Sequence, residues 1–531
     1  MKDLDTFLAE VRGIGVKLWV EGGRLKLRAP EGVLTPELTD ALRERKAEIL
    51  ALLRPQPAYA IPPVPAAESY ELSAAQRRLW VLAQFPEASA AYNIPLHQFL
   101  EGSLDVVALE EALNRLVRRH ESLRTTFIAV DGEPRQVVHA ELRTPLEFRD
   151  LEDLEHPEEA ARQLGRQAAV EPFDLENGPL LKAGLLRLGP ERHILLFTLH
   201  HIVSDGVSIG VLTRDLSELY EAARTGRPAR LPPLSIGYTA YTVWQNQRLA
   251  DEFMAVHRRY WLVKLSGELP VLDLPADYPR PPVQTFRGRE LSFTLPAGRL
   301  EALRAYCRER SASLFMALHA VLKVLLFAYT GKPDLIIGSP VAGRDHPDLN
   351  DQIGLYLNTL ALRDPIRADQ TFEQFFAQVR QTTTEAFDHG IYPFDRLVNE
   401  LHLKRDLSRF PLFDVVLILQ NQDEPGLTLG EISARPVFEH PGTSKFDLTF
   451  CFKESPAGLI LGLEFNTDLF REDRIRCMGN HVLTLIGSIL GNPDQAVGRL
   501  NLLTDAERRQ LLDEFNRTAA PYPRDRTLVD L

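Results

Sequence analysis

Residues 195–201 form an apolar run that alternates with a period of two. The alternation predicts a strand with two distinct faces, one carrying Leu195, Phe197, Leu199 and His201, the other Leu196, Thr198 and His200. The two histidines are therefore expected to point to opposite sides. The amphipathic run 207–225 predicts a helix, which Ser204 or Asp205 would cap and Gly226 would end.

Residues 1–54 show a separate pattern of helix, hairpin and helix. Two short alternating runs flank Gly22-Gly23, which predicts a two-residue hairpin loop. With that loop, the core side would pair Val20 with Leu25 and Leu18 with Leu27, and the other side would carry Lys17, Trp19, Arg24, Lys26 and Arg28. Thr35 and Pro36 would open the second helix. The proline-rich residues 55–68 predict an extended linker.

The remaining chain predicts a mixed α/β fold in two loosely similar halves. The first half contains an amphipathic helix through Leu109, Leu113 and Leu116. The second half is expected to contain a strongly apolar helix opened by Ser311 or Ser313, a buried strand and a pair of alternating strands, at residues 314–326, 335–341, 446–452 and 458–465. A proline-rich stretch at residues 274–282 is expected near the join.

Composition narrows the class of protein. The chain has 531 residues, 44% of them hydrophobic and 25% charged, as in an ordinary globular protein. The net charge of −12 argues against general affinity for nucleic acid or anionic membranes. Three separated cysteines suggest neither a disulfide framework nor a metal site, and so a reducing compartment. Without a signal-peptide pattern or a membrane-spanning run, we predict a cytoplasmic protein.

An imidazole held at a strand end beside a carboxylate can serve as a general base near neutral pH. His201 and Asp205 are therefore candidates for acyl-transfer chemistry. Structural interpretations remain open, with His200 as a core histidine, Asp205 as a helix cap and His201 as an exposed strand end. Zinc is not expected, because adjacent strand histidines diverge and no further ligands complete a site.

The string Leu199-His-His-Ile-Val-Ser-Asp-Gly206 resembles the HHxxxDG signature of condensation domains of nonribosomal peptide synthetases. These domains belong to the chloramphenicol-acetyltransferase-like superfamily. Further stretches resemble the other motifs of the family, with an opening motif of the type that joins L-configured residues: residues 73–80, 91–95, 119–127, 238–244, 351–360, 389–395 and 405–413. The chain departs from the usual motifs at Val207, Ala240 and Gly390-Ile391.

The resemblance implies two acetyltransferase-like lobes arranged in a V, at residues 69–270 and 271–498, and a connector toward an adenylation domain at 499–531. His201 would lie in a tunnel between them, and the motif residues His200, His201, Asp205 and Gly206 would form the catalytic set. His201 would accept a proton, position the amine, or both. Asp205 would form a structural salt bridge with an arginine, for which Arg344 is the candidate. Gly206 would allow close approach of the substrate.

The same resemblance implies that no cofactor is bound directly and that the substrates arrive attached to carrier proteins. Donor and acceptor would each be a thioester on the phosphopantetheine arm of an upstream or downstream peptidyl carrier protein, and no metal is expected. Residues 1–54 resemble the TubC-type N-terminal docking domain, whose hairpin receives the C-terminal tail of an upstream subunit as an added strand. We expect an acidic tail here, bound by Lys17, Trp19, Arg24, Lys26 and Arg28. The alternative is that Trp19 packs and the basic residues form a solvated face.

Two other functions compete with amide-bond formation. A related enzyme would catalyse epimerisation or heterocyclisation, but the opening motif argues against the first, and the DxxxxD pattern of the second is absent at this position. A degenerate member would only recruit partners, and the intact histidine motif counts against it. Neither the amino acids joined nor the final product can be predicted from the sequence.

Overall fold

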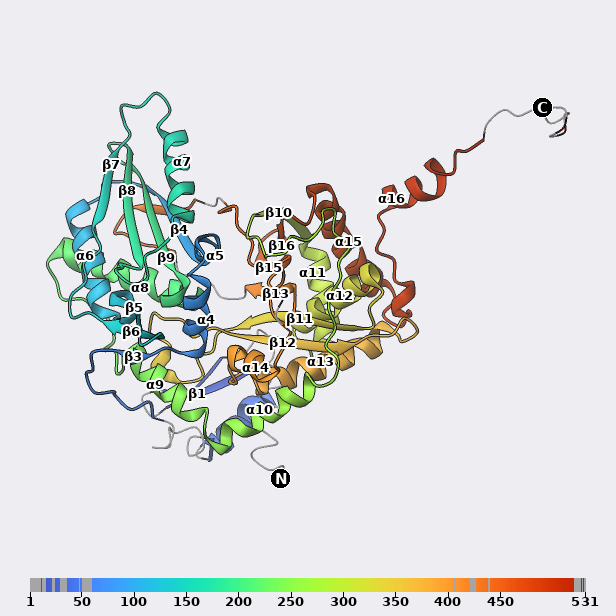
Figure 1. The fold of residues 1–531 in the computed structure, drawn as a ribbon, viewed down its shortest axis with the longest axis horizontal. Helices are drawn as coiled ribbons and strands as arrows, with labels where there is room; N and C mark the ends of the chain where they lie inside the picture. Colours follow the sequence, from blue (N-terminus) through green and yellow to red (C-terminus); the bar gives the residue numbers. More distant parts are fainter. Residues whose placement is uncertain are drawn as a thin grey trace.

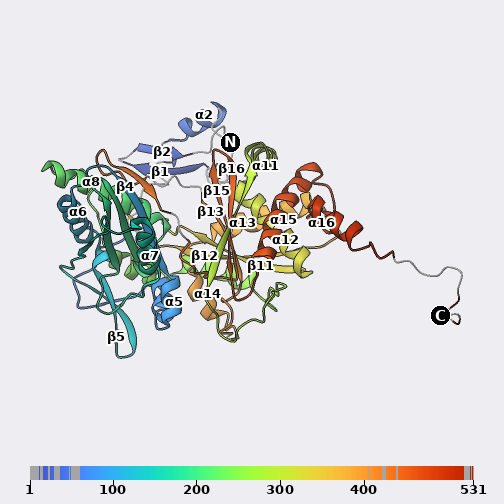
Figure 2. The same ribbon diagram turned by 90° about the horizontal axis from the view of Figure 1, so that it is seen from above.

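The computed structural model describes residues 11, 16–21, 24–28, 36–46, 48–49, 60–404, 406–420, 426–437, 440–519, 527 and 529. At the N-terminus, the strands β1 (Lys17–Glu21) and β2 (Arg24–Arg28) pair antiparallel, and α2 covers Pro36–Glu44. The register places Val20 opposite Leu25 and Leu18 opposite Leu27, which confirms the predicted pairing. Leu27 is nevertheless 38% exposed, so its predicted place on the core side holds only in part. Figure 2 shows the hairpin between the two larger halves of the molecule.

The N-terminal half is built on a five-stranded sheet (Figure 1). Its strand order is β14 (Ser433–Pro436), β4 (Asn93–Glu101), β9 (Arg192–His200), β8 (Leu181–Gly189) and β7 (Leu146–Asp150). Leu195, Phe197 and Leu199 pack toward α6 (Val106–Arg119) and α8 (Gly206–Thr225), whereas Leu196 packs toward α7 (Pro157–Val170). The alternation predicted for this strand is therefore confirmed up to Leu199.

Smaller elements complete this half and cover the end of the sheet that carries the histidines. A three-stranded sheet has the order β3 (Tyr70–Glu71), β6 (Glu133–Val138) and β5 (Thr125–Val130). The short helices nearby are α4 (Ala74–Leu82), α5 (Pro86–Ala91), η2 (Glu121–Arg124), η3 (His201–Val203) and α9 (Tyr238–Arg248). Helix α4 contacts η3, and α9 contacts β3 and η2.

The C-terminal half is built on a six-stranded sheet. Its order is β10 (Gly288–Pro296), β16 (Gly458–Asn466), β15 (Leu448–Ser455), β13 (Val415–Gln420), β11 (Asp334–Val341) and β12 (Asn358–Pro365). The largest hydrophobic core lies between this sheet and the helices α11 (Ala297–Glu309), α12 (Leu314–Thr330), α13 (Phe372–Asp388) and α15 (Glu472–Gly491). Helices α10 (Glu252–Lys264) and α14 (Phe394–Glu400) cover the other face.

The structure decides between the two predicted caps of α12 and corrects two predicted boundaries, one in each half. Ser313, not Ser311, caps α12, because its hydroxyl accepts the main-chain N–H of Met316. The paired strands begin at Leu448 rather than residue 446, since the preceding residues are held by loop contacts. In the first half, α8 begins at Gly206, one residue earlier than predicted.

The two halves stand as the arms of a V and are joined by a strand that crosses between them (Figure 1). β14 follows β13 in the chain, yet it pairs antiparallel with β4 of the N-terminal sheet, Ser433 lying opposite Glu101. Leu427, Leu429 and Ile432 of the same segment are buried in the N-terminal core. Residues 271–498 thus contribute a strand to the other half.

After α15 the chain leaves the body through α16 (Asp505–Arg509) (Figure 1). Over the described part of the chain, no single helix has both the length and the apolar composition needed to cross a membrane.

Candidate active site

The histidine pair lies where β9 ends beside the C-terminal half. His200 is the last residue of the strand, and His201 begins the one-turn helix η3. The strand alternation therefore stops before His201, and the direction of its side chain is set by the turn. The main-chain N–H of His201 donates to the carbonyl of Tyr92 at 2.8 Å, which ties the turn to the start of β4.

His200 stabilises the turn. Its side chain is 1% exposed, its Nδ1 accepts the main-chain N–H of Ile202 at 3.1 Å, and its ring packs edge-on against Phe173. Burial is the main cause that lowers the pKa of His200 to about 3, and the electrostatic effects of the neighbouring His201 and of Lys445 act in the same direction. These contacts favour a structural role over direct chemistry for His200.

His201 is half-buried and packs edge-on against Tyr92, with ring centroids 6.3 Å apart. Its pKa is lowered to about 3, first by burial and then by the positive charge of Lys445, while main-chain groups of His201 and Ser204 act in the opposite direction. The imidazole is therefore neutral at physiological pH and can accept a hydrogen bond from an amine.

Asp205 caps α8 and reaches the C-terminal half at the same time. Its Oδ1 accepts the main-chain N–H and the hydroxyl of Ser208 at 2.8 and 2.7 Å, so Asp205 rather than Ser204 is the cap. Its Oδ2 accepts the main-chain N–H of Tyr356 at 2.9 Å. Arg344 Nη2 lies 3.1 Å from Asp205 Oδ1, so the structure brings this pair of side chains together.

Arg344 extends the contact to the segment 349–356. Its Nη1 donates to the carbonyls of Leu349 and, at 2.8 Å, Gln352, and its guanidinium lies 4.3 Å from the centroid of the Tyr356 ring. Both oxygens of the Asp205 carboxylate thus accept hydrogen bonds from donors of the protein itself. This geometry favours a structural role.

Gly206 is exposed at the first position of α8. A Cβ at this position would meet no atom within 4 Å. Contacts within the protein therefore do not require glycine, and space remains beside the histidine turn.

A second ion pair between the halves was not predicted. Arg78 Nε of α4 lies 2.8 Å from Asp395 Oδ1 of α14. Arg78 also interacts with the hydroxyl of Tyr92, whose pKa is raised mainly by burial and lowered in part by Arg78. Arg78 and Asp395 each lie in a stretch that resembles a motif of the family, and this resemblance was the sequence signal for them. No local sequence pattern predicts that the two side chains pair in space.

Lys445 is the other residue that sequence analysis missed. It precedes β15, and its Nζ lies 4.9 Å from the centroid of the Tyr92 ring. Burial lowers the pKa of Lys445 to about 8, with Glu464 raising and Arg78 lowering it. Lys445 lies just before the predicted strand 446–452 and outside every family motif, so no sequence signal pointed to it.

A cavity of about 1510 Å³ adjoins these residues. Both halves line it, and its walls include Arg78, Tyr92 and Asp395 from the site. Further cationic residues around it are Arg77, Arg396, Lys404 and Arg409. The cavity is large enough for an extended substrate and reaches the residues that surround His201.

The predicted docking residues occupy β1 and β2 in the predicted register. Lys17 lies opposite Arg28, Trp19 opposite Lys26, and Glu21 opposite Arg24. Their side chains lie outside what the structure describes, so the expected basic face stays a prediction.

Comparison with known proteins identifies the family. Residues 66–512 match the condensation domain family, and residues 4–55 match the TubC N-terminal docking domain. Tyrocidine synthase 3 of Brevibacillus parabrevis is 39% identical over 471 residues, which are 89% of this chain and 7% of that protein. Surfactin synthase subunit 2 of Bacillus subtilis (strain 168) is 40% identical over 464 residues, 87% of this chain and 13% of that protein. The chain thus spans a small part of these relatives.

Solved structures agree with this assignment. The X-domain from teicoplanin biosynthesis superposes with a TM-score of 0.75 at 28% identity, covering 84% of this chain and all of that one. The first condensation domain of the calcium-dependent antibiotic synthetase has the same fold, with a TM-score of 0.67 at 23% identity, and the match covers 82% of this chain and all of that one. The chain therefore belongs to the condensation domains of nonribosomal peptide synthetases, the acyltransferase-type enzymes that form amide bonds, and carries a TubC-type docking domain at its N-terminus.

Proposed function

We propose that this chain joins a donor acyl or peptidyl thioester to the amine of an acceptor aminoacyl thioester, each held on the phosphopantetheine arm of a carrier protein. The amine nitrogen attacks the donor carbonyl, the carbon–sulfur bond breaks, and the donor's carrier thiol leaves with a proton. The proposal is carried by the imidazole of His201, which packs against Tyr92, a residue in the wall of the cavity that both halves line. Since the thioester is already activated, no covalent nucleophile on the enzyme is required.

His201 acts chiefly as a hydrogen-bond acceptor that orients the amine. An imidazole with a pKa of about 3 is a weak base toward an ammonium group, so complete proton abstraction by His201 is unfavourable. Orientation is effective by itself, because effective molarities in well-aligned reactions reach ~10⁵ M or more. Asp205 and Arg344 support this geometry by holding α8 against the C-terminal half.

One of the two arms occupies the cavity of about 1510 Å³. Arg77, Arg396 and Lys404 on its wall are suited to the phosphate of phosphopantetheine, since cationic side chains bind phosphate through charge-assisted hydrogen bonds. The upstream and downstream partners are peptidyl carrier proteins. No directly bound cofactor or metal is part of this mechanism.

The N-terminal module binds the acidic C-terminal tail of an upstream subunit. In the part of the chain that the structure describes, β1 and β2 pair only with each other, so an extended peptide can add a strand at an edge. Lys17, Trp19, Arg24, Lys26 and Arg28 supply the charge and the aromatic contact. The chain continues into an adenylation domain. It functions in the cytoplasm, a reducing compartment in which the three free cysteines, Cys307, Cys451 and Cys477, stay as thiols.

Reconstitution with two loaded carrier proteins tests the proposal. The expected product is an amide on the acceptor carrier, detected by intact-protein mass spectrometry, in wild type and not in His201→Ala. Epimerised or cyclised product would instead support the related enzyme classes.

Recruitment without catalysis is a second candidate, because a similar X-domain has been solved in complex with OxyB. Carrier binding without product in the wild-type protein would support it.

A further inference from the structure

We propose that Tyr92 is a positioning residue for His201, because its aromatic ring fixes the direction in which the imidazole presents a nitrogen to the acceptor amine. The inference rests on the role proposed above for His201. It adds a residue outside the histidine motif, and it assigns different tasks to the ring and to the hydroxyl of Tyr92.

The main chain brings the two residues together at the end of the N-terminal sheet. β4 pairs with β9 as far as Asn93, which lies opposite His200. The next residues along these two segments are Tyr92 and His201. The main-chain N–H of His201 donates to the Tyr92 carbonyl at 2.8 Å, and the N–H of Tyr92 donates to the Ser89 carbonyl at 3.0 Å. These bonds involve no side chain, so a substitution at residue 92 leaves the turn of His201 in place.

Packing, rather than a hydrogen bond, holds the imidazole of His201. Its Nδ1 is buried and makes no hydrogen bond with the residues that the structure describes, although main-chain groups of His201 and Ser204 lie nearby. The rings of His201 and Tyr92 pack edge-on, with centroids 6.3 Å apart and planes at 66°. T-shaped contacts between rings have a preferred geometry. Because Nδ1 is buried, Nε2 is the nitrogen available to the amine.

The neighbouring histidine has a similar contact but a further attachment. The ring of His200 packs edge-on against Phe173, with centroids 5.9 Å apart and planes at 76°. In addition, its Nδ1 accepts the main-chain N–H of Ile202 at 3.1 Å. A hydrogen bond therefore fixes the ring of His200, whereas the ring of His201 depends on its aromatic neighbour. Tyr92 and Phe173 are 6% and 7% exposed, so the two contacts are matched in burial.

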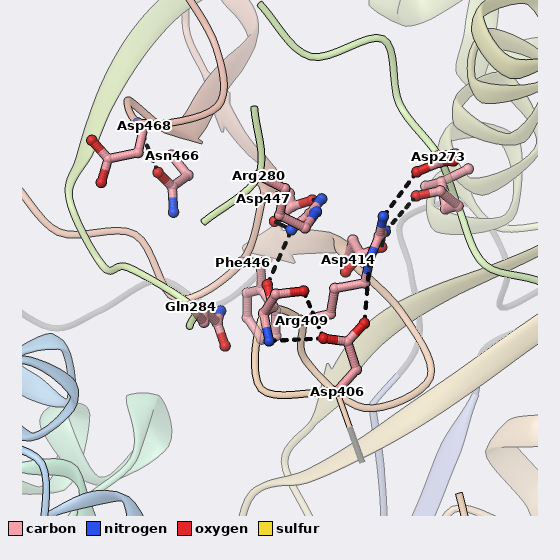
Figure 3. Close-up of polar contacts among 12 residues, drawn as sticks. Asp273, Arg280, Gln284, Asp406, Arg409, Asp414, Phe446, Asp447, Asn466 and Asp468 are labelled. Carbon is pink, nitrogen blue, oxygen red and sulfur yellow. Dashed lines mark hydrogen bonds and ion pairs between the residues drawn. The ribbon is translucent and has the colours of Figure 1, made fainter. Parts of the chain in front are cut away.

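The ring of Tyr92 is itself held from the C-terminal half. Lys445 Nζ lies 4.9 Å from its centroid, a cation–π distance. The main chain of Lys445 is anchored by its neighbours (Figure 3). Gln284 Nε2 donates to the carbonyl of Lys445 at 2.9 Å, and the ring of Phe446 packs against Phe410, with centroids 4.8 Å apart. With contacts to both halves, the Tyr92 ring is a fixed surface against which the imidazole packs.

The hydroxyl of Tyr92 has a different environment from the ring. It interacts with Arg78, and both residues line the cavity of about 1510 Å³. The hydroxyl therefore belongs to the cavity wall, whereas the ring contacts the imidazole. Orientation of His201 should survive the loss of the hydroxyl but not the loss of the ring. A misplacement of about 1 Å can lower the rate of an aligned reaction by about 100-fold.

The test is a series at residue 92, made in the full chain: Tyr92→Phe keeps the ring, and Tyr92→Leu and Tyr92→Met remove it. The mobility of the His201 ring is measured from NMR relaxation of ¹³C-labelled histidine, with the signal assigned by His201→Ala. We expect mobility near that of wild type in the Phe variant and higher mobility in the Leu and Met variants.

Amide formation is measured with the same proteins. We expect the Leu and Met variants to lose about tenfold to 100-fold in kcat, with kcat/KM falling in parallel, and the Phe variant to retain most of the rate. Phe173→Leu is the matched control, because it removes the ring that packs against His200. It should lower the melting temperature and leave both the mobility of His201 and kcat near wild type.

Several results would overturn the proposal: wild-type kcat without the ring, equal losses in the Phe and Leu variants, an equal loss in Phe173→Leu, or a loss of kcat without a change in the mobility of His201. If the Leu variant does not fold, the Met variant decides, since its flexible side chain fills irregular space. A wild type that makes no amide refutes the proposed function separately, because the mobility measurement needs no turnover.

Discussion

Asp205 Oδ1 and Arg344 Nη2 lie 3.1 Å apart in a contact between the two halves, with only 1% and 4% of the side chains exposed. Both charges are surrounded by hydrogen-bond partners on α8 and on the segment 349–356. The pair therefore couples the start of the helix beside His201 to the opposite half.

Removing either partner leaves an uncompensated buried charge. We expect Asp205→Ala and Arg344→Ala each to lower the free energy of unfolding by about 3–5 kcal/mol, together with a loss of activity. Chemical denaturation measures the effect. Asp105→Ala is a matched control, because Asp105 caps α6 without such a pair and should cost only about 1 kcal/mol. An inactive Asp205 variant of wild-type stability would instead indicate a chemical role.

Alanine variants of the two histidines should differ, one losing activity and the other losing stability. His201→Ala is expected to lose most condensation while its melting temperature stays near wild type, because the ring is only half-buried. His200→Ala should lower the melting temperature, since it removes the acceptor for Ile202 and leaves a cavity. Product formation is measured by mass spectrometry and melting by calorimetry. Wild-type product yields from the His201 variant would exclude its proposed role.

Gly206→Ala tests whether substrate uses the space at the start of α8. A Cβ meets no protein atom within 4 Å, so the variant should be as stable as wild type or slightly more so. If the substrate passes close to this backbone, kcat/KM should fall by about tenfold or more, because small displacements of aligned groups are costly. Unchanged kcat/KM would show that this space is not part of the substrate path.

Asp414 should make stability depend on pH. Burial, and then the negative charge of Asp447, raises the pKa of Asp414 to about 7, despite Arg409 at 2.7 Å (Figure 3). A raised pKa in the folded state means that Asp414 favours folding at low pH, and that this contribution is lost as the pH rises from about 4 to about 7. Asp414→Asn should therefore gain roughly 2 kcal/mol relative to wild type between pH 5 and pH 8.

Denaturation at the two pH values measures this difference. Asp406→Asn is the control in the same cluster, because hydrogen bonds from Ser408 lower the pKa of Asp406, so it titrates below pH 5. An equal shift for both variants between pH 5 and pH 8 would contradict the assignment to Asp414.

Charge reversal at Lys26 and Arg28 tests the docking module. We expect the double change to Glu to abolish transfer from the upstream carrier but to spare reaction with donor supplied at high concentration. Binding of the upstream tail to the full chain should be weak and should weaken further with salt, since exposed charges are screened over ~8–10 Å. Isothermal titration in low and high salt measures it. Tight binding that does not depend on salt, or no binding at all, would refute the proposed role of the basic side chains in binding the tail.

Local pattern was sufficient for much of the fold. The strand, turn and helix at 195–225 and the register of the N-terminal hairpin follow from apolar periodicity, helix caps and a two-residue loop. These signals act between residues close in the chain, so they can be read without knowing the partners. The histidine motif pointed to His201 and Asp205, and the family resemblance implied an arginine partner for Asp205, for which Arg344 was the candidate; the structure brings that pair together.

Other parts were decided by tertiary structure alone. The crossing of β14 to the N-terminal sheet, the ion pair of Arg78 with Asp395, and the approach of Lys445 to Tyr92 all join segments from different halves. The local sequence pattern does not predict these contacts, because the apolar periodicity of each half is explained by the core of that half alone. Only packing of the halves against each other brings the C-terminal ammonium group of Lys445 to the Tyr92 ring beside His201, and burial at that junction lowers the pKa of His201.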